Sequence, residues 1–260
     1  MRRLVLAAVM FGTAAGAQAA DMPDFLRGSL PAGPVNWQGF YIGGQGAVGE
    51  SDMNFTGATQ SVTAKLLADT AAENAAAVST WPLGGKTSTR GTGLGGFAGY
   101  NSQWDNVVVG VEFSYLHGKF GGSQSDSMAR SFNDGAGNLD EITYQSNASI
   151  AISDMGTFRA RAGYAVGTFL PYAFGGVALG QADIVRTATI SGTQSGVPFT
   201  PLTATDGQYS HLIYGYSGGL GVDVMLMSCL FMRAEWEYIR FTSAIDTDVN
   251  TFRVGLGYKF

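Results

Sequence analysis

The sequence predicts an all-β protein, an eight-stranded antiparallel up-and-down transmembrane β-barrel with short periplasmic turns and long extracellular loops. Three observations predict this class: an N-terminal export signal, eight segments of alternating hydrophobicity, and connections that alternate between short and long. The alternation is clearest in the last segment, NTFRVGLGYKF. Large apolar residues from Phe252 to Phe260 occupy one face of this strand, and small or charged residues occupy the other.

The N-terminus has the three parts of a secretory signal peptide. Arg2 and Arg3 form a basic start, an apolar run follows, and AQA at residues 17–19 fits the small-x-small cleavage pattern. A membrane anchor is the less favoured alternative, because the apolar run is shorter than the roughly 20 residues that a spanning helix needs. We therefore predict that residues 1–19 are a signal peptide, cleaved after residue 19 or 20.

The rest of the chain divides into two parts. Residues 20–36 contain three prolines together with charges and glycines, and we predict a short periplasmic linker there. The alternating pattern begins near Trp37, so we predict that residues 37–260 form the outer-membrane barrel. Because the chain ends with its last strand, we do not expect a peptidoglycan-binding domain.

The composition is rich in glycine and aromatic residues and poor in charge. The chain has 38 Gly, 12% aromatic residues and only 13% charged residues, whereas soluble domains carry about 25% charged residues. A net charge of −5 argues against nucleic acid as a partner. The single cysteine, Cys229, excludes a disulfide scaffold. Since no metal-ligand or phosphate-loop motif occurs, we expect no cofactor and no metal.

The eight predicted strands alternate between two kinds of connection. They lie at residues 39–49, 91–101, 107–118, 156–166, 170–183, 211–224, 230–241 and 250–260. Each is long enough to cross a membrane as a tilted strand, which takes about 9–11 residues. Only a few residues follow the second, fourth and sixth strands. Long polar stretches at 49–90, 119–147 and 186–210, and a shorter one near 242–249, follow the first, third, fifth and seventh. This layout is typical of outer-membrane barrels, with both chain ends in the periplasm.

Charged residues occur on the strand faces opposite to the aromatic ones. A soluble sandwich would place them in water, but this alternative does not explain why charges are few and of both signs. In a membrane barrel the apolar face contacts lipid and the other face lines the interior. We therefore predict eight interior charges: Glu112, Arg159, Arg161, Asp223, Arg233, Glu235, Glu237 and Arg253.

An eight-stranded barrel is narrow enough to be filled by its own side chains. Because buried charges must pair, we expect these residues to form a salt-bridged plug, and we favour a structural or surface role in the cell envelope. A narrow porin-like channel for small solutes is the alternative, and a surface adhesin or ligand-binding barrel acting through its loops is a second. We do not expect an enzyme, because neither His117 nor His211 has an acidic residue at close spacing.

Seven motifs in order also resemble a known family. They are NWQGFYIGGQGAVG, GGFAGYNSQW, VVVGVEFSY, GTFRARAGYAVGTFLPYAFGGVALG, YGYSGGLGVDV, RAEWEYIRF and NTFRVGLGYKF. They are similar to the small alphaproteobacterial outer-membrane β-barrel proteins, often labelled porin family and related to the OmpA-type transmembrane domain. The chain departs from that pattern in the Ala-rich stretch TAKLLADTAAENAAAV, where we expect a short helix.

This resemblance implies a location and partners. It implies an eight-stranded barrel in the outer membrane of a Gram-negative bacterium, in contact with outer-membrane lipid. It also implies insertion by the outer-membrane assembly machinery, which recognises a final strand ending in Phe. Phe252, Tyr258 and Phe260 would then carry the assembly signal. No extracellular ligand can be named from the resemblance.

Overall fold

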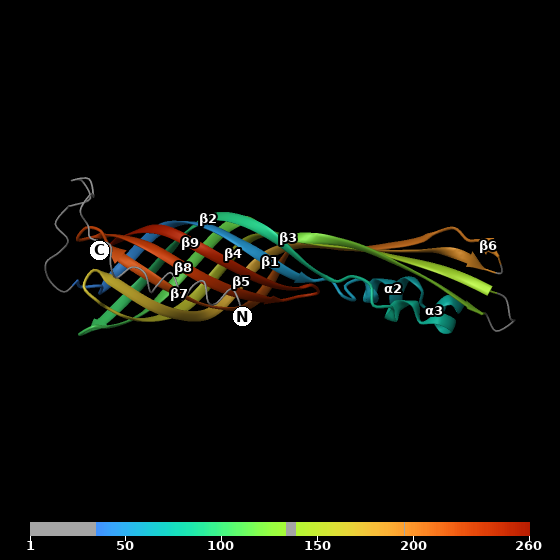
Figure 1. The fold of residues 1–260 in the computed structure, drawn as a ribbon, viewed down its shortest axis with the longest axis horizontal. Helices are drawn as coiled ribbons and strands as arrows, with labels where there is room; N and C mark the ends of the chain where they lie inside the picture. Colours follow the sequence, from blue (N-terminus) through green and yellow to red (C-terminus); the bar gives the residue numbers. More distant parts are fainter. Residues whose placement is uncertain (1–34, 134–138, 195) are drawn as a thin grey trace, which may run out of the picture.

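The computed structural model describes residues 35–133, 139–194 and 196–260, which form an antiparallel barrel with a sheet extension at one end (Figure 1). The described strands are β1 (Gly39–Asn54), β2 (Lys86–Trp104), β3 (Val107–Asn133), β4 (Leu139–Tyr164), β5 (Phe169–Gln194), β6 (Val197–Pro198), β7 (Leu202–Met225), β8 (Leu230–Thr242) and β9 (Asp246–Lys259). Between β1 and β2 lie two short helices, α2 (Gln60–Leu66) and α3 (Ala71–Ala76), and the 3₁₀ turn η3 (Val78–Thr80).

Eight of these strands close into a ring. The order is β4-β3-β2-β1-β9-β8-β7-β5, and the pairing of β4 with β5 completes the circle. The two-residue strand β6 pairs only with the outer end of β5. Neighbours in the ring follow one another along the chain and every pairing is antiparallel, which confirms the predicted fold class. The predicted signal peptide and residues 20–34 of the linker lie outside the described residues, so those boundaries stay predictions.

Four strands are much longer than predicted and carry the sheet beyond the barrel. β3, β4, β5 and β7 have 27, 26, 26 and 24 residues, whereas β8 and β9 have 13 and 14. Most of the stretches 119–147 and 186–210, which the sequence assigned to loops, therefore continue as strand. Many small polar residues in these stretches hide the alternation of apolar and polar positions. The alternation is nonetheless present: Ile142, Tyr144 and Ile190 face inward and are buried. We call this part the sheet extension.

The strands leave the barrel at irregular positions. The register shifts between His117 and Phe120 on β3, and between Ile152 and Asp154 on β4. A third shift lies between Ala182 and Ile184 on β5. A bulge adds a residue to one strand and bends it, so these positions mark where the sheet opens from the closed ring.

The connection between β1 and β2, residues 55–85, forms a cap on the sheet extension. Its helices confirm the helix expected in the Ala-rich stretch. The hydroxyl group of Tyr144 on β4 hydrogen-bonds with Thr59 at 2.6 Å and accepts a hydrogen bond from Thr63 at 2.7 Å. Apolar contacts complete the attachment. The buried cluster consists of Val62, Leu67, Val78, Trp81, Leu83, Ile142, Tyr144, Ala188 and Ile190.

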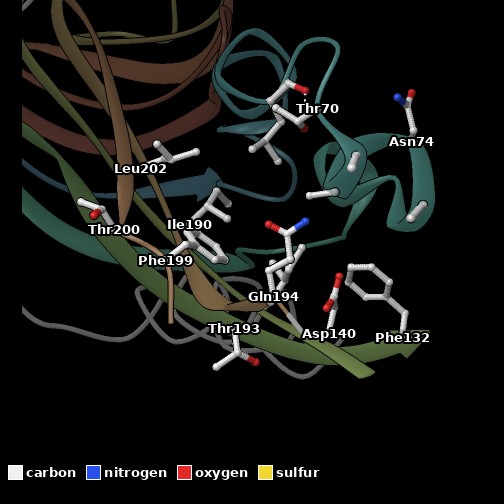
Figure 2. Close-up of a pocket in the computed structure, with 15 residues that line it drawn as sticks. Thr70, Asn74, Phe132, Asp140, Ile190, Thr193, Gln194, Phe199, Thr200 and Leu202 are labelled. Atoms are coloured by element: carbon white, nitrogen blue, oxygen red, sulfur yellow. Dashed lines mark hydrogen bonds between the residues drawn. The ribbon is translucent and has the colours of Figure 1, made fainter. Parts of the chain in front are cut away.

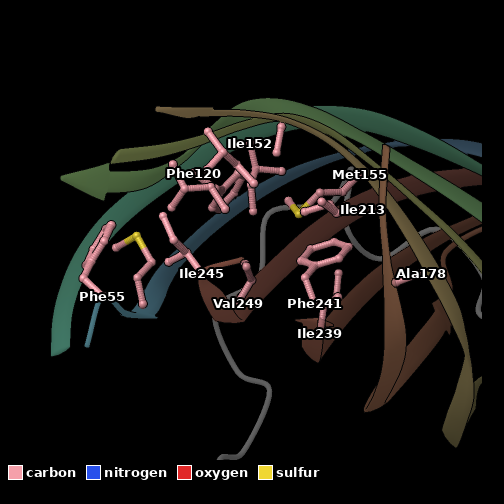
Figure 3. Close-up of a cluster of buried hydrophobic side chains, with 14 of the residues drawn as sticks. Phe55, Phe120, Ile152, Met155, Ala178, Ile213, Ile239, Phe241, Ile245 and Val249 are labelled. Atoms are coloured by element: carbon pink, nitrogen blue, oxygen red, sulfur yellow. The ribbon is translucent and has the colours of Figure 1, made fainter. Parts of the chain in front are cut away.

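The barrel interior has two apolar layers. The lower layer lies at the end of the short turns, where Trp37 packs edge-on against Phe231 with 6.2 Å between ring centroids. The upper layer lies toward the sheet extension and includes Phe55, Phe120 and Phe241 (Figure 3). The predicted interior charges are not part of either cluster.

The outer face of the barrel carries the large apolar side chains. The most exposed on the predicted strands include Phe40, Leu94, Phe113, Phe158, Leu212, Trp236 and Phe252. Phe113, Phe158, Leu212, Trp236 and Phe252 have the strand parity that the sequence assigned to lipid. No helix among the described residues is long and apolar enough to cross a membrane.

Candidate functional site

All eight predicted interior charges are buried, and each is at most 3% exposed. They project from β3, β4, β7, β8 and β9 into the middle of the barrel. The set holds four arginines and four carboxylates, so its formal charge is zero. The structure therefore brings together all the charged residues that sequence parity placed inside.

Glu112 on β3 is the centre of this network. It accepts hydrogen bonds from Nε of Arg159 at 3.0 Å and from Nη1 of Arg233 at 2.8 Å. Arg161 contributes a longer contact of 3.4 Å, and the Tyr41 hydroxyl donates at 2.6 Å. Glu112 and Arg159 lie directly opposite each other in the β3–β4 register. Three cations and one phenol thus surround a single carboxylate.

Two further carboxylates extend the network across the barrel. Asp223 on β7 accepts hydrogen bonds from Nη2 of Arg161 at 2.7 Å and from Nε of Arg233 at 2.8 Å. Glu235 on β8 accepts from Nη2 of Arg159 on β4 at 2.8 Å. Because β8 is not a neighbour of β3 or β4 in the ring, the pairs Glu112–Arg233 and Arg159–Glu235 bridge the lumen.

Arg253 on the last strand forms an ion pair with Glu237. The sequence offered Glu235 or Glu237 as its partner without choosing between them. Glu235 is the residue directly opposite Arg253 in the β8–β9 register, yet the guanidinium reaches Glu237. Glu237 also lies 3.5 Å from Nη1 of Arg159. Its carboxylate is held by these ion pairs without a well-aligned hydrogen bond.

Aromatic rings cover the faces of three guanidinium groups. Arg161 lies 3.7 Å from the ring centroid of Tyr172, which also hydrogen-bonds to Glu235. Two more such contacts pair Arg233 with Phe97 at 3.9 Å and Arg159 with Phe174 at 4.0 Å. Contacts of this kind add a cation–π attraction that is stronger where water is absent.

The sequence prediction did not include these aromatic partners or the Tyr41 phenol. One signal could have found them, because residues of the inward parity on their strands include Tyr41, Phe97, Tyr172 and Phe174. No signal in the sequence gives the pairs that cross the lumen. Those depend on strand tilt and on the relative height of strands on opposite sides of the ring.

A second polar cluster lies on the outer face of the barrel. Nδ1 of His117 on β3 is 2.8 Å from Oδ1 of Asp154 on β4. The sequence analysis considered only acidic residues at close spacing in the sequence and therefore missed this partner of His117. Asp154 is 37 residues away in sequence, and only the β3–β4 register brings it close. His211, the other histidine, is exposed on β7.

Asp154 lies beyond the membrane-spanning part of β4, at the bulge where the sheet extension begins. Hydrogen bonds from Ser153, Tyr115 and His117 lower the pKa of its carboxyl to about 2. The carboxylate is therefore ionised at neutral pH and fixes the orientation of the His117 ring, whose side chain remains 68% exposed.

The comparison with known sequences fits this architecture. The chain matches the outer membrane protein beta-barrel domain over residues 4–260. It belongs to this family of outer-membrane β-barrels.

Two similar proteins come from named bacteria. A 25 kDa outer-membrane immunogenic protein of Brucella ovis is 28% identical over 181 residues, covering 67% of this chain and 70% of that protein. A 22 kDa outer membrane protein of Rhizobium leguminosarum bv. viciae is 25% identical over 240 residues, covering 88% and 80%. Both genera are alphaproteobacterial, and the chain is accordingly a protein of the Gram-negative outer membrane.

Solved structures in the comparison are also outer-membrane barrels. Ail, the attachment invasion locus protein of Yersinia pestis, is 13% identical and aligns over 86% of this chain and 99% of its own, with a TM-score of 0.37. OprG of Pseudomonas aeruginosa is 15% identical over 86% and 96%, with a TM-score of 0.38.

Proposed function

We propose that this family member is a closed barrel that does not conduct, with a structural and surface role in the cell envelope. The observation that carries the proposal is the charge network that bridges the lumen. Ion pairs join opposite walls through Arg233 and Arg159, and apolar layers lie above and below them. A conducting path would need water through all three levels, so this packing favours a plug over the narrow-channel alternative.

A planar bilayer experiment tests the closed barrel. We expect the refolded mature protein to show no steady single-channel openings. Arg233→Ala removes a side chain that spans the lumen and should produce measurable openings. Arg186→Ala is the matched control, because Arg186 pairs with Asp206 in the sheet extension, outside the barrel. Steady, ion-selective openings of the unaltered protein would contradict the proposal and favour the channel.

A surface-binding role is a second candidate, and it is favoured by a cavity between the cap and the sheet extension. The cavity has a volume of about 780 Å³ and its lining is mostly apolar. Figure 2 shows Phe132, Ile190 and Leu202 around it, together with the polar side chains of Gln194 and Asp140. Ligand cavities commonly have about 300–1,000 Å³ and few polar groups. We infer that this cavity is suited to a compact apolar ligand.

Matched variants in the cap test this second role. Ala75→Trp should fill the cavity, because Ala75 lines it, whereas Ala64→Trp alters an exposed position of α2 outside it. The probe is 4-fluorobenzyl alcohol, whose ¹⁹F signal broadens when it binds to the protein in nanodiscs. We expect broadening with the unaltered protein and with Ala64→Trp, and a loss of broadening with Ala75→Trp. Equal broadening by both variants would show that the probe partitions into lipid only.

The long-hairpin end of the barrel is proposed to be extracellular and the end of the last strand periplasmic, and Phe260 is proposed to mark the chain for assembly. The ring of Phe260 is 73% exposed and packs edge-on against Tyr258, with 5.1 Å between centroids. Its backbone N–H donates to the Phe40 carbonyl at 2.9 Å, which fixes the terminal residue against β1. The aromatic residue at the end of the last strand is the feature that supports recognition by the assembly machinery.

Deletion of Phe260 tests the assembly signal. We expect export to continue while the amount of barrel in the outer membrane falls, with unassembled chain collecting in the periplasm. Deletion of the single residue Gly196, in the turn between β5 and β6, serves as a control for a shortened chain. Normal outer-membrane levels of the chain lacking Phe260, at modest expression, would show that the terminus is not the signal.

A further inference from the structure

The outer wall of the barrel contains a groove in the region where β1, β2, β3 and β9 lie side by side. Its volume is about 770 Å³. Val48, Leu94, Phe252 and Val254 form its apolar walls, and glycines such as Gly46 form its floor. The groove exists because Gly46 has no side chain on a face that elsewhere carries large apolar residues.

Two polar side chains close the end of this groove that points toward the sheet extension. They are His117 and Lys119 on β3, and both line the groove. Lys119 is exposed. His117 is held by Asp154 through Nδ1, which leaves its Nε2 edge free to contact a ligand. The groove is thus apolar along its length and cationic at one end.

The surroundings limit what can occupy such a surface. The walls belong to the apolar band that contacts lipid in a membrane barrel. His117 and Lys119 lie about ten residues from the start of β3 at Val107, which is the length of a membrane crossing. They therefore lie at the level of the lipid headgroups. Among the described residues Lys119 forms no ion pair: exposed Glu50 lies opposite Arg90 in the register of β1 and β2, and Asp154 contacts His117.

We propose that this groove is a specific site for one lipid whose phosphate headgroup carries a net negative charge. Its acyl chain lies over Gly46 between Leu94 and Phe252, and its phosphate contacts Lys119 and His117. A phosphate oxygen accepts hydrogen bonds from the Lys119 ammonium and, when the ring is protonated, from Nε2 of His117. The assignment of this lipid to the outer leaflet rests on the orientation proposed above, but the site itself does not.

The structure supplies a matched pair of variants for the acyl part of the site. A Cβ at Gly46 would meet only the Leu94 side chain, at 3.5 Å, so Gly46→Leu fits and fills the groove. Gly44 is on the same face of the same strand but does not line the groove. A Cβ there would lie 3.9 Å from its nearest neighbour, so Gly44→Leu is equally tolerated. Lys119→Gln tests the phosphate part, with Lys86→Gln, exposed at the outer start of β2, as its control.

Native mass spectrometry of the refolded mature protein measures the lipid that stays bound. The probes are dioleoyl phosphatidic acid and dioleoyl phosphatidylcholine, and a shift in gel migration on heating verifies folding of every variant. We expect one retained phosphatidic acid, in preference to phosphatidylcholine. Lys119→Gln should lower the apparent affinity about fivefold, since a basic residue at a membrane surface contributes about 1 kcal/mol. Gly46→Leu should abolish retention, while Gly44→Leu and Lys86→Gln leave it unchanged.

Three results would overturn the proposal. Equal retention of both lipids would show that the site does not select a headgroup with a net negative charge, because phosphatidylcholine also carries a phosphate but is zwitterionic. Unchanged retention in Gly46→Leu would show that the lipid lies elsewhere on the barrel. If Lys119→Gln does not fold, the two glycine variants decide the outcome. An equal loss of lipid retention in Gly46→Leu and Gly44→Leu would show that lipid binds non-specifically around the barrel wall. None of these results depends on which end of the barrel faces the cell exterior, because all are measured on purified protein.

Discussion

The barrel interior and the cap are closed in different ways. Inside the barrel, charged side chains from opposite walls meet with almost no exposed surface. In the cap, a neutral cluster around Trp81 and the hydroxyl groups of Thr59, Thr63 and Tyr144 joins helices to one face of a sheet. Removing one partner of a buried ion pair leaves an unpaired charge away from water, whereas removing an apolar residue of the cap leaves only a neutral cavity. A substitution in the interior should therefore lower the stability of the whole barrel, whereas a substitution in the cap should loosen only the cap.

Glu112→Gln should have the largest effect on the interior. It leaves Arg159, Arg161 and Arg233 without their shared carboxylate, and breaking a buried ion pair costs about 3–5 kcal/mol. The free energy of unfolding, measured by urea titration in lipid vesicles, should fall by about that amount. Glu141→Gln is the control, because Glu141 is exposed on the sheet extension. Equal stability of the two variants would mean that the network does not hold the walls together.

Arg253→Met should destabilise the barrel by about 3 kcal/mol, at the lower end of that range. The loss is smaller because Glu237 keeps its contact with Arg159 at 3.5 Å. Adding Glu237→Gln should restore part of the stability, since it removes the stranded carboxylate. Adding Glu235→Gln should restore none, although Glu235 is the residue opposite in register. Rescue by Glu235→Gln instead would identify the other carboxylate as the working partner.

Trp81→Ala should disturb the cap without disturbing the barrel. The ring is 3% exposed and its loss removes apolar contact that typically contributes about 3–5 kcal/mol locally. We expect faster proteolysis within residues 55–85 of the protein in vesicles. The free energy of unfolding of the barrel should change by less than about 0.5 kcal/mol, because the cluster that contains Trp81 shares no residue with the two apolar layers of the barrel. A barrel midpoint that falls as far as in Arg253→Met would show that cap and barrel unfold together.

The smallest expected effect concerns pH and Asp154. Its pKa in the folded protein is lowered to about 2 from a usual value of 3.8. A lowered folded pKa stabilises the protein above the unfolded value, and this stabilisation is lost as pH falls from about 4 toward 2. Because Asp154 is near the surface, the change should be slight. The difference in urea midpoint between the unaltered protein and Asp154→Asn should therefore shrink over that interval and remain constant above pH 5.

The barrel could be predicted from the sequence because the pattern along each strand is enough to assign the inward and outward faces of that strand. Alternation along each strand places Glu112, Arg159 and Arg253 inside without any knowledge of their neighbours. Strand order follows from short turns, which is why the adjacent pair Glu112–Arg159 could be anticipated. The choice between Glu235 and Glu237 could not be made, because it depends on how the long Arg253 side chain tilts along the strand axis.

The sequence analysis missed two other features, one because its residues are far apart in the sequence and one because its hydrophobic alternation is weak. The contact between His117 and Asp154 joins strands whose register is set by a hairpin extending far beyond it. The sheet extension was assigned to loops because Ser, Thr, Asn and Gln occupy its outward positions and weaken the hydrophobic alternation. Its inward residues, such as Ile142 and Tyr144, are buried by the cap rather than by a barrel core.

The sheet extension also determines how far from the lipid surface its outer end is displayed. β4 has 26 residues and β8 has 13, and at about 3.3 Å per residue this difference corresponds to about 40 Å along the strand. The four extended strands are continuous with the membrane-spanning wall, so their outer end is carried on a stiff arm rather than a flexible tether. With this end facing the cell exterior, as proposed above, a large molecule could touch it while remaining well clear of the headgroups. A stiff arm would also lower the entropic cost of binding, because it does not have to be ordered when contact is made.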